Sequence, residues 1–242
     1  MTDAPALERD AEQHHHAHRD VNGGWLRPAV FGAMDGLVSN LALIAGVAAA
    51  AGASSHVVLV AGLAGLLAGS FSMAVGEWTS VNSQAELVHA EIAKERRELV
   101  RRPAAEQAEL AALFASRGVP RPLAKQVAHE LSQDPELVWR IHVREELGVD
   151  PDNLASPYVA ALSSLFSFAV GAFVPLLPYV AGVDQLWPSL VLAAVSLATL
   201  GASVARFTDR PLWLGATRQL GLGAAATAIT YGVGSAFGVG LS

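Results

Sequence analysis

Acidic side chains recur at helical spacing in the middle of this chain. Glu91, Glu95 and Glu98 stand at i, i+4 and i+7, so a helix over this stretch presents three carboxylates on one face. A second predicted helix carries Glu106 and Glu109 at i and i+3. Carboxylates crowded on facing helices repel one another unless a cation lies between them. A cation site is therefore one interpretation of this pattern.

A third predicted helix adds His142, Glu145 and Glu146. Carboxylate oxygens with one imidazole suit the divalent ions Fe²⁺, Mn²⁺, Co²⁺, Ni²⁺ and Zn²⁺. The alternative is a solvated acidic face paired with the neighbouring basic residues Lys94, Arg96, Arg97 and Arg101. Spacing alone leaves both interpretations open.

A single carboxylate interrupts the first apolar segment. Asp35 is followed by Ser39, one helical turn later, and by Asn40. An Asp near the centre of a spanning helix costs about 2.5–3.5 kcal/mol on insertion scales, so such a residue usually faces a pathway or a partner. We predict an ion pathway here. The alternative is a hydrogen bond between packed helices from a protonated Asp.

The second apolar segment carries polar groups along one stripe. Gly69, Met73, Glu77 and Ser80 stand at i, i+4, i+8 and i+11. A soft thioether beside a hard carboxylate suits Fe²⁺ better than Ca²⁺ or Mg²⁺. We place Met73 and Glu77 on the transport pathway with Asp35, Ser39 and Asn40. The alternatives are packing for Met73 and an interfacial position for Glu77.

The elements that carry these residues are predicted to be membrane helices. Hydrophobic residues make up 52% of the 242 and charged residues only 16%; 23 of the 38 charged residues lie within 84–156. A spanning helix needs about 20 mostly apolar residues. Five segments meet this length: 28–51, 56–81, 157–180, 186–205 and 212–241. We predict an all-α integral membrane protein with five transmembrane helices and a helical insert between spans two and three.

The basic residues predict the orientation. All 16 Lys and Arg residues precede span one, lie in the insert, or surround the loop between spans four and five. Basic loops stay in the cytoplasm. We therefore expect the N-terminus and the insert in the cytoplasm and the C-terminus on the other side. The predicted domains are a tail at 1–27, spans one and two at 28–83, a metal-binding insert at 84–156, and spans three to five at 157–242.

Composition and motifs exclude several functions. The chain contains no cysteine, so it has no disulfide, Cys-based metal site or thiol nucleophile. A sequence pI near 5.7 without a basic tract argues against nucleic-acid binding. No nucleophile–base pair or phosphate loop stands out, so we expect neither an enzyme nor a tightly bound cofactor. Metal ions, protons and membrane lipid remain the expected partners.

Two histidine motifs give weaker indications of metal binding. Di-iron bundles use two Glu-x-x-His motifs with two further glutamates, and the insert contains one such motif, Glu86 with His89. The histidine run at 14–18 indicates weak, incidental metal affinity.

Proline and glycine residues mark the ends of the predicted helices of the insert. These helices lie at about 84–102, 104–116, 122–133 and 135–147, and the first is continuous with span two.

Together these motifs resemble the vacuolar iron transporter family, as a bacterial-type member with the cytoplasmic insert. The resemblance rests on the acidic insert and three short motifs, Met34-Asp35-Gly36-Leu37, Ser72-Met73-Ala74-Val75-Gly76-Glu77 and Val174-Pro175-Leu176-Leu177-Pro178-Tyr179. It implies a homodimer, a pore between the two copies of span one, and proton-coupled export of Fe²⁺, and often Mn²⁺, from the cytoplasm. It assigns Asp35 and Met73 to the pore, and metal binding to Glu95, Glu98, Glu106, Glu109 and Glu146.

The chain departs from plant-type members at three places. Gly65 stands where they carry a pore glutamate, Ser39-Asn40 where they carry a proline, and His142 nearest to a methionine site of the insert. Histidine would favour borderline ions and make binding more sensitive to pH. The resemblance implies the cell membrane for a bacterial protein, which we favour, and the vacuolar membrane for a eukaryotic one. The alternatives are a membrane-anchored metal sensor or buffer and a di-iron oxidase.

Overall fold

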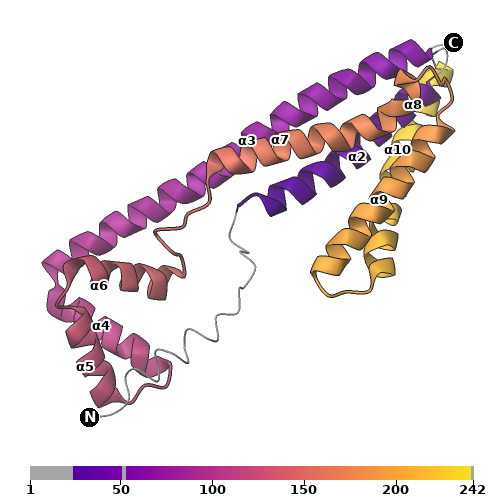
Figure 1. The fold of residues 1–242 in the computed structure, drawn as a ribbon. Helices are drawn as coiled ribbons and strands as arrows, with labels where there is room; N and C mark the ends of the chain where they lie inside the picture. Colours follow the sequence, from indigo (N-terminus) through magenta and orange to yellow (C-terminus); the bar gives the residue numbers. More distant parts are fainter. Residues whose placement is uncertain (1–23, 51–52, 241–242) are drawn as a thin grey trace.

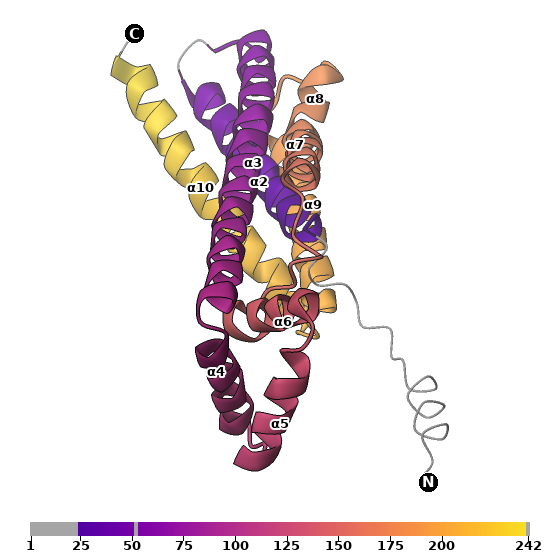
Figure 2. The same ribbon diagram turned by 90° about the vertical axis from the view of Figure 1, so that its left-hand side faces the viewer.

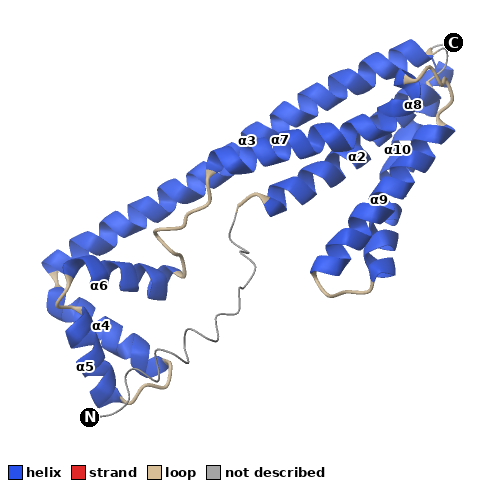
Figure 3. Cartoon of the chain, in the orientation of Figure 1, coloured by secondary structure: helices blue, strands red, loops and turns tan. Residues whose placement is uncertain are grey.

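The computed structural model describes residues 24–50 and 53–240, and this part of the chain contains helices and no β-strand (Figures 1 and 3). Five of these helices are long and apolar enough to cross a membrane. They are α2 (Leu26–Ala49), α3 (Ser55–Arg101), α7 (Pro157–Phe173) with its continuation into α8 (Leu177–Val180), α9 (Trp187–Phe207) and α10 (Leu212–Gly240). The predicted all-α fold with five apolar spans is confirmed. The histidine run at 14–18 lies outside the described residues.

Helix α3 joins the membrane part of the molecule to the insert. It has 47 residues, which at 1.5 Å per residue makes a helix of about 70 Å, more than twice the hydrocarbon thickness of a bilayer. The Ser54 side chain caps its first turn by accepting a hydrogen bond from the backbone N–H of Val57. Pro103 begins the next helix directly after α3 ends. One rigid element therefore carries residues of both candidate sites (Figure 1).

Helix α2 forms the centre of the membrane part, packed against α3, α7, α9 and α10. Its buried residues Leu37, Leu41 and Ile44 belong to the membrane core. Gly36 allows close contact with α7, because a Cβ atom at this position would lie 2.3 Å from the carbonyl oxygen of Phe168. This contact fixes the depth and rotation of the helix that carries Asp35.

The insert is a group of short helices at the far end of α3 (Figure 2). Helices α4 (Pro103–Ser116), α5 (Arg121–Leu131) and α6 (Pro135–His142) enclose a small apolar core formed by Leu110, Ala111, Ala128 and Val138. The helix predicted at 135–147 changes character after His142: Val143–Leu147 is a π-helix that ends at Gly148, where φ is +66°. Such wide turns are frequent at functional sites.

Candidate metal centre

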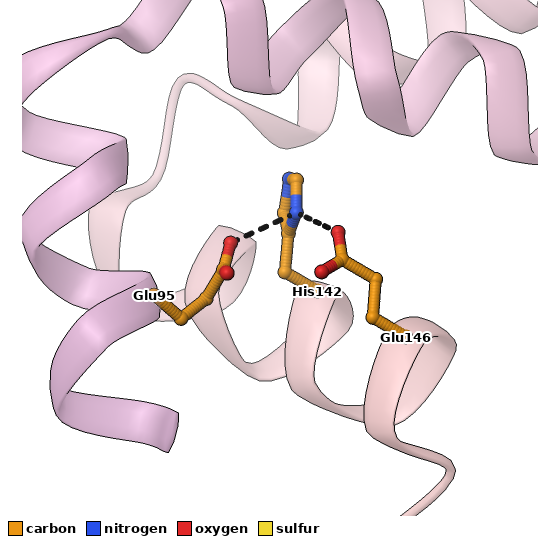
Figure 4. A group of neighbouring side chains, drawn as sticks. All are labelled: Glu95, His142 and Glu146. Atoms are coloured by element: carbon orange, nitrogen blue, oxygen red, sulfur yellow. Dashed lines mark hydrogen bonds and ion pairs between the residues drawn. The ribbon is translucent and has the colours of Figure 1, made fainter. Parts of the chain in front are cut away.

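Three side chains of the insert converge on one point (Figure 4). The Nδ1 atom of His142 lies 2.9 Å from Oε1 of Glu146 and 3.1 Å from Oε1 of Glu95. One ligand atom from each residue lies within 4.8 Å of the other two. His142 is fully buried, whereas the side chains of Glu95 and Glu146 keep 16% and 26% of their surface exposed. The histidine side of the group is thus buried, and its carboxylate side is partly exposed to solvent.

Each of the three residues comes from a different element. Glu95 lies on α3, His142 is the last residue of α6, and Glu146 lies on the π-helix that follows. His142 and Glu146 are four residues apart, so the turn places both on one face. The neighbouring residue Glu145 does not join this group and instead forms an ion pair with Arg117. The π-helical turn therefore directs Glu146 toward His142 and Glu145 toward Arg117.

Further carboxylates surround this group. Oε2 of Glu106, a buried residue of α4, lies 3.9 Å from Nδ1 of His142. Burial raises the pKa of Glu95 to about 7, together with the negative charges of Glu146, Glu106 and Glu109 and against the opposing effect of His142. Burial and the charge of Glu109 likewise raise the pKa of Glu106. The metal-free cluster is electrostatically unfavourable when its carboxylates are ionised.

Two buried atoms of the cluster also lack a hydrogen-bond partner among the described residues, and the first is Oε1 of Glu95. The second is Nε2 of His142, which makes no hydrogen bond to any residue that the structure describes. The carboxylates of Glu95, Glu106 and Glu146 face the other ring nitrogen, Nδ1. A divalent ion held between Nδ1 and these carboxylate oxygens would neutralise the carboxylates.

The structure separates the predicted insert ligands into two groups. Glu95, Glu106 and Glu146 lie around His142, and the charges of Glu98 and Glu109 act on Glu106. Two predicted ligands lie elsewhere: Glu91 pairs with Lys94 at 3.4 Å, and Glu145 pairs with Arg117. The residues of the di-iron alternative also lie on the surface, where the side chain of Glu86 accepts a hydrogen bond from Asn82.

A second candidate site lies in the membrane part. Residues of α2, α3 and α7 line a cavity of about 280 Å³. The lining contains four of the five predicted pathway residues, and also Gly65, where plant-type members carry a glutamate. The full lining is Asp35, Ser39, Asn40, Leu43, Gly65, Gly69, Ser72, Met73 and Phe168. The sequence did not predict Phe168, because its contribution depends on the packing of α7 against α2. The cavity offers a cation one carboxylate, one thioether and neutral oxygens.

Local hydrogen bonds orient the polar groups of this cavity. Asn40 donates from Nδ2 to the carbonyl oxygen of Ala172, at 2.7 Å, and its Oδ1 atom is buried without a hydrogen-bond partner among the described residues. Ser39 donates to the carbonyl oxygen of Asp35 at 2.6 Å. The contact to α7 turns the amide oxygen of Asn40 toward Gly65, where a Cβ atom would lie 2.9 Å from it.

Glu77 lies outside this lining. It is one turn beyond Met73 on the insert side of α3, and its side chain is only 10% exposed. Its carboxylate lies 3.1 Å from the guanidinium of Arg27, at the start of α2. The pair joins α2 to α3 between the membrane cavity and the insert.

These features define a helical membrane protein that has a cavity with one carboxylate between its spans and an acidic cluster in a helical insert. Comparison with known sequences gives the family: the model of the VIT family matches residues 26–235, and the chain belongs to this family. The predicted resemblance is confirmed.

The relatives that match are similar along nearly their whole length. A protein of Acanthamoeba castellanii named vacuolar iron transporter is 40% identical over 90% of this chain and 81% of its own. Vacuolar iron transporter 1 of Oryza sativa subsp. japonica is 31% identical over 92% and 90%, and that of Arabidopsis thaliana is 29% identical over 90% and 88%. These names are those of transporters, which supports the expectation that the chain is not an enzyme.

Proposed function

We propose that this chain is a transporter of divalent iron that moves Fe²⁺ out of the cytoplasm in exchange for protons. The observation that carries the proposal is the cluster of Glu95, His142 and Glu146, whose ligand atoms lie within 4.8 Å of one another beside further carboxylates. Oxygen ligands with one imidazole suit Fe²⁺, and they also suit Mn²⁺ as a second substrate. Relatives named vacuolar iron transporter support iron as the cargo.

In this proposal the insert captures the ion and the membrane cavity passes it on. The cluster lies in the cytoplasm, in agreement with the distribution of basic residues, and raises the local concentration of M²⁺. The ion then enters the cavity between α2 and α3, where Asp35 and Met73 replace part of its hydration shell. Glu77, one turn nearer to the insert than Met73, lies on the way between the two sites.

Proton exchange follows from the chemistry of a single carboxylate. Asp35 is the one acidic residue in the lining of the described cavity. Its carboxylate holds either a proton or the metal ion, because binding of M²⁺ requires the deprotonated form. Metal transport in one direction is thereby coupled to proton transport in the other.

The proposal includes a homodimer with its pore between the two copies of α2, in the cell membrane of a bacterium. The exposed residue Ser39 lines the cavity on α2 and would then lie near its counterpart. Because the chain has no cysteine, Ser39→Cys creates a unique cross-linking site. We expect cross-linked dimers with Ser39→Cys and none with Val191→Cys, at an exposed position of α9. Equal cross-linking of both variants would contradict this arrangement.

The function is tested by Fe²⁺ uptake into proteoliposomes that contain a pH-sensitive dye, for wild type and Asp35→Ala. We expect metal entry with proton exit for the wild type, and loss of both for the variant. Folded wild-type protein that binds Fe²⁺ without flux would instead indicate a sensor or buffer. Oxygen consumption that depends on Glu86 and His89 would indicate a di-iron oxidase. Replacing Fe²⁺ by Mn²⁺ tests the second substrate.

A further inference from the structure

An aromatic side chain links the two helices that carry the main ligands of the metal centre. The guanidinium carbon of Arg96, on α3, lies 4.1 Å from the centre of the Trp139 ring, on α6. The same guanidinium lies 3.6 Å from Glu136, and Glu136 accepts a hydrogen bond of 3.0 Å from the indole nitrogen of Trp139. We call Arg96, Trp139 and Glu136 the aromatic clamp. It is a closed set of three contacts, of which the two made by Arg96 cross from α3 to α6.

The aromatic clamp lies directly beside the metal centre. Arg96 is the residue after Glu95 on α3, and Trp139 precedes His142 by three residues on α6. Residues three apart on a helix are neighbours on one face. The Arg96–Trp139 contact therefore runs beside the Glu95–His142 contact of 3.1 Å and connects the same two helices. The separation of α3 and α6 sets both distances.

From this geometry we propose that Arg96 and Trp139 are positioning residues for the metal centre. The proposal rests on the proposed metal-binding function of the insert. Without a cation, the crowded carboxylates of the centre push α3, α4 and the end of α6 apart, and only His142 contributes an opposing charge from within the group. The clamp holds α6 on α3 against this repulsion. It keeps His142, which is fully buried, within reach of the same ion as Glu95.

A neighbouring residue offers a matched control. The guanidinium carbon of Arg140 also lies near the Trp139 ring, at 5.2 Å, but Arg140 belongs to α6 itself and pairs with Asp152 at 2.6 Å. It contacts the same ring without a bond to α3. Arg140→Gln therefore removes a cation beside Trp139 while leaving the link between the two helices in place.

The test is Co²⁺ titration of the full-length protein in detergent, read by the visible absorption of bound Co²⁺ and by tryptophan emission. Loss of an outer partner of a metal ligand weakens binding by about 10- to 100-fold. We expect this loss, with a changed Co²⁺ spectrum, for Arg96→Gln and Trp139→Leu. Trp139→Phe, which keeps an aromatic face for Arg96, should restore most of the affinity, and Arg140→Gln should bind as wild type does.

The outcomes separate the clamp from the metal centre itself. If Glu95→Gln weakens Co²⁺ binding but Arg96→Gln and Trp139→Leu bind with the affinity and spectrum of the wild type, the clamp proposal is overturned and the metal centre stands. If Glu95→Gln also binds as the wild type does, the proposed metal centre is wrong and the clamp falls with it. Should Trp139→Leu fail to fold, Arg96→Gln decides, because the Arg96 side chain is half exposed and its loss leaves no cavity in the core.

Discussion

The two candidate sites use carboxylates in opposite ways. The insert gathers Glu95, Glu106 and Glu146 around one buried histidine, with the charges of two further glutamates close by. The membrane cavity has a single carboxylate, Asp35, among neutral groups. Both sites are attached to the same helix, α3, so the contrast lies in their ligands and not in the scaffold.

This contrast fits the different tasks of a capture site and a transport site. Crowded carboxylates attract a divalent ion strongly, but a site on a pathway must also release it, so its binding must remain weak. A bilayer adds a second limit, since every additional charge inside it costs free energy. A sparse membrane site beside a rich insert site is therefore the arrangement that we expect for capture followed by transport.

The largest effect is expected from Asp35→Asn, which removes the only carboxylate of the membrane cavity. Fe²⁺ flux into proteoliposomes should fall to the level of protein-free vesicles, while Co²⁺ binding by the insert stays unchanged. Asp209→Asn is the control: this residue lies in the turn after α9, with a φ of +51° that Asn also tolerates. Flux in the Asp35 variant equal to that of the control would remove the distinction between the two sites.

The converse substitution, Glu95→Gln, breaks the insert site. It removes one of the three grouped ligands, and we expect Co²⁺ affinity measured by calorimetry to fall by about 100-fold, or about 2.8 kcal/mol. Glu91→Gln is the matched control on the same helix, one turn earlier, where the side chain is 41% exposed and paired with Lys94. Equal losses in both variants would favour a diffuse acidic face over a defined centre.

The pH dependence of the insert provides a third test. Because the pKa of Glu95 is raised to about 7, mainly by burial and then by Glu146, an ion that binds below pH 7 must displace a proton. Co²⁺ affinity should therefore fall by about tenfold for each pH unit below 7, for a single proton, and level off above it. A titration between about pH 5.5 and 8 checks this, and Glu95→Gln should flatten the slope.

The same shift has a consequence for stability, with a defined sign. A folded-state pKa above the ordinary value of 4.5 means that this group contributes stability below pH 4.5 that is lost as the pH rises through about 7. The metal-free insert should thus be more stable at mildly acidic pH than at neutral pH. Bound Co²⁺ should remove this difference, because it stabilises the insert at neutral pH. If the melting temperature of the metal-free protein does not change with pH over this interval, the ionised carboxylates of the cluster do not destabilise the fold, which would contradict this prediction.

Local patterns predicted the elements, whereas long-range packing decided the partners. Apolar runs defined five spans, and helical spacing brought Glu95 and Glu98 onto one face, because both signals reside in neighbouring residues. That spacing treats Glu91 and Glu95 alike, and only the position of α6 against α3 brings His142 to one and not to the other. The π-helical turn after His142 depends on such contacts in the same way.

Residues far apart in the sequence were beyond this kind of prediction. Arg27 and Glu77 are separated by 50 positions, and Asn40 and Ala172 by 132, yet both pairs form hydrogen bonds. The Arg96–Trp139 contact is another example, since neither residue type signals the other. Contacts of this kind follow from how helices pack, and no local pattern records them.

The smallest effect is expected from a substitution that makes the membrane cavity resemble the insert. Gly65→Glu adds a second carboxylate to the lining that contains Asp35. A Cβ atom at this position would lie 2.4 Å from the end of the Leu43 side chain and 2.9 Å from Oδ1 of Asn40, so both side chains must shift to admit it. We expect a lower KM for Fe²⁺ and a lower maximal rate, each by a few fold, because tighter binding slows release.

Gly65→Gln separates charge from size in this last experiment, since it adds the same bulk without the carboxylate. If the Glu variant alone lowers KM, the weak binding of the membrane cavity results from its low number of carboxylates, as the comparison of the two sites requires. If both variants slow transport without changing KM, the bulk beside Asn40 and Leu43 obstructs the ion, and affinity at this level of the membrane does not depend on charge. That result would leave the insert as the one place in the described chain where carboxylate number sets metal affinity.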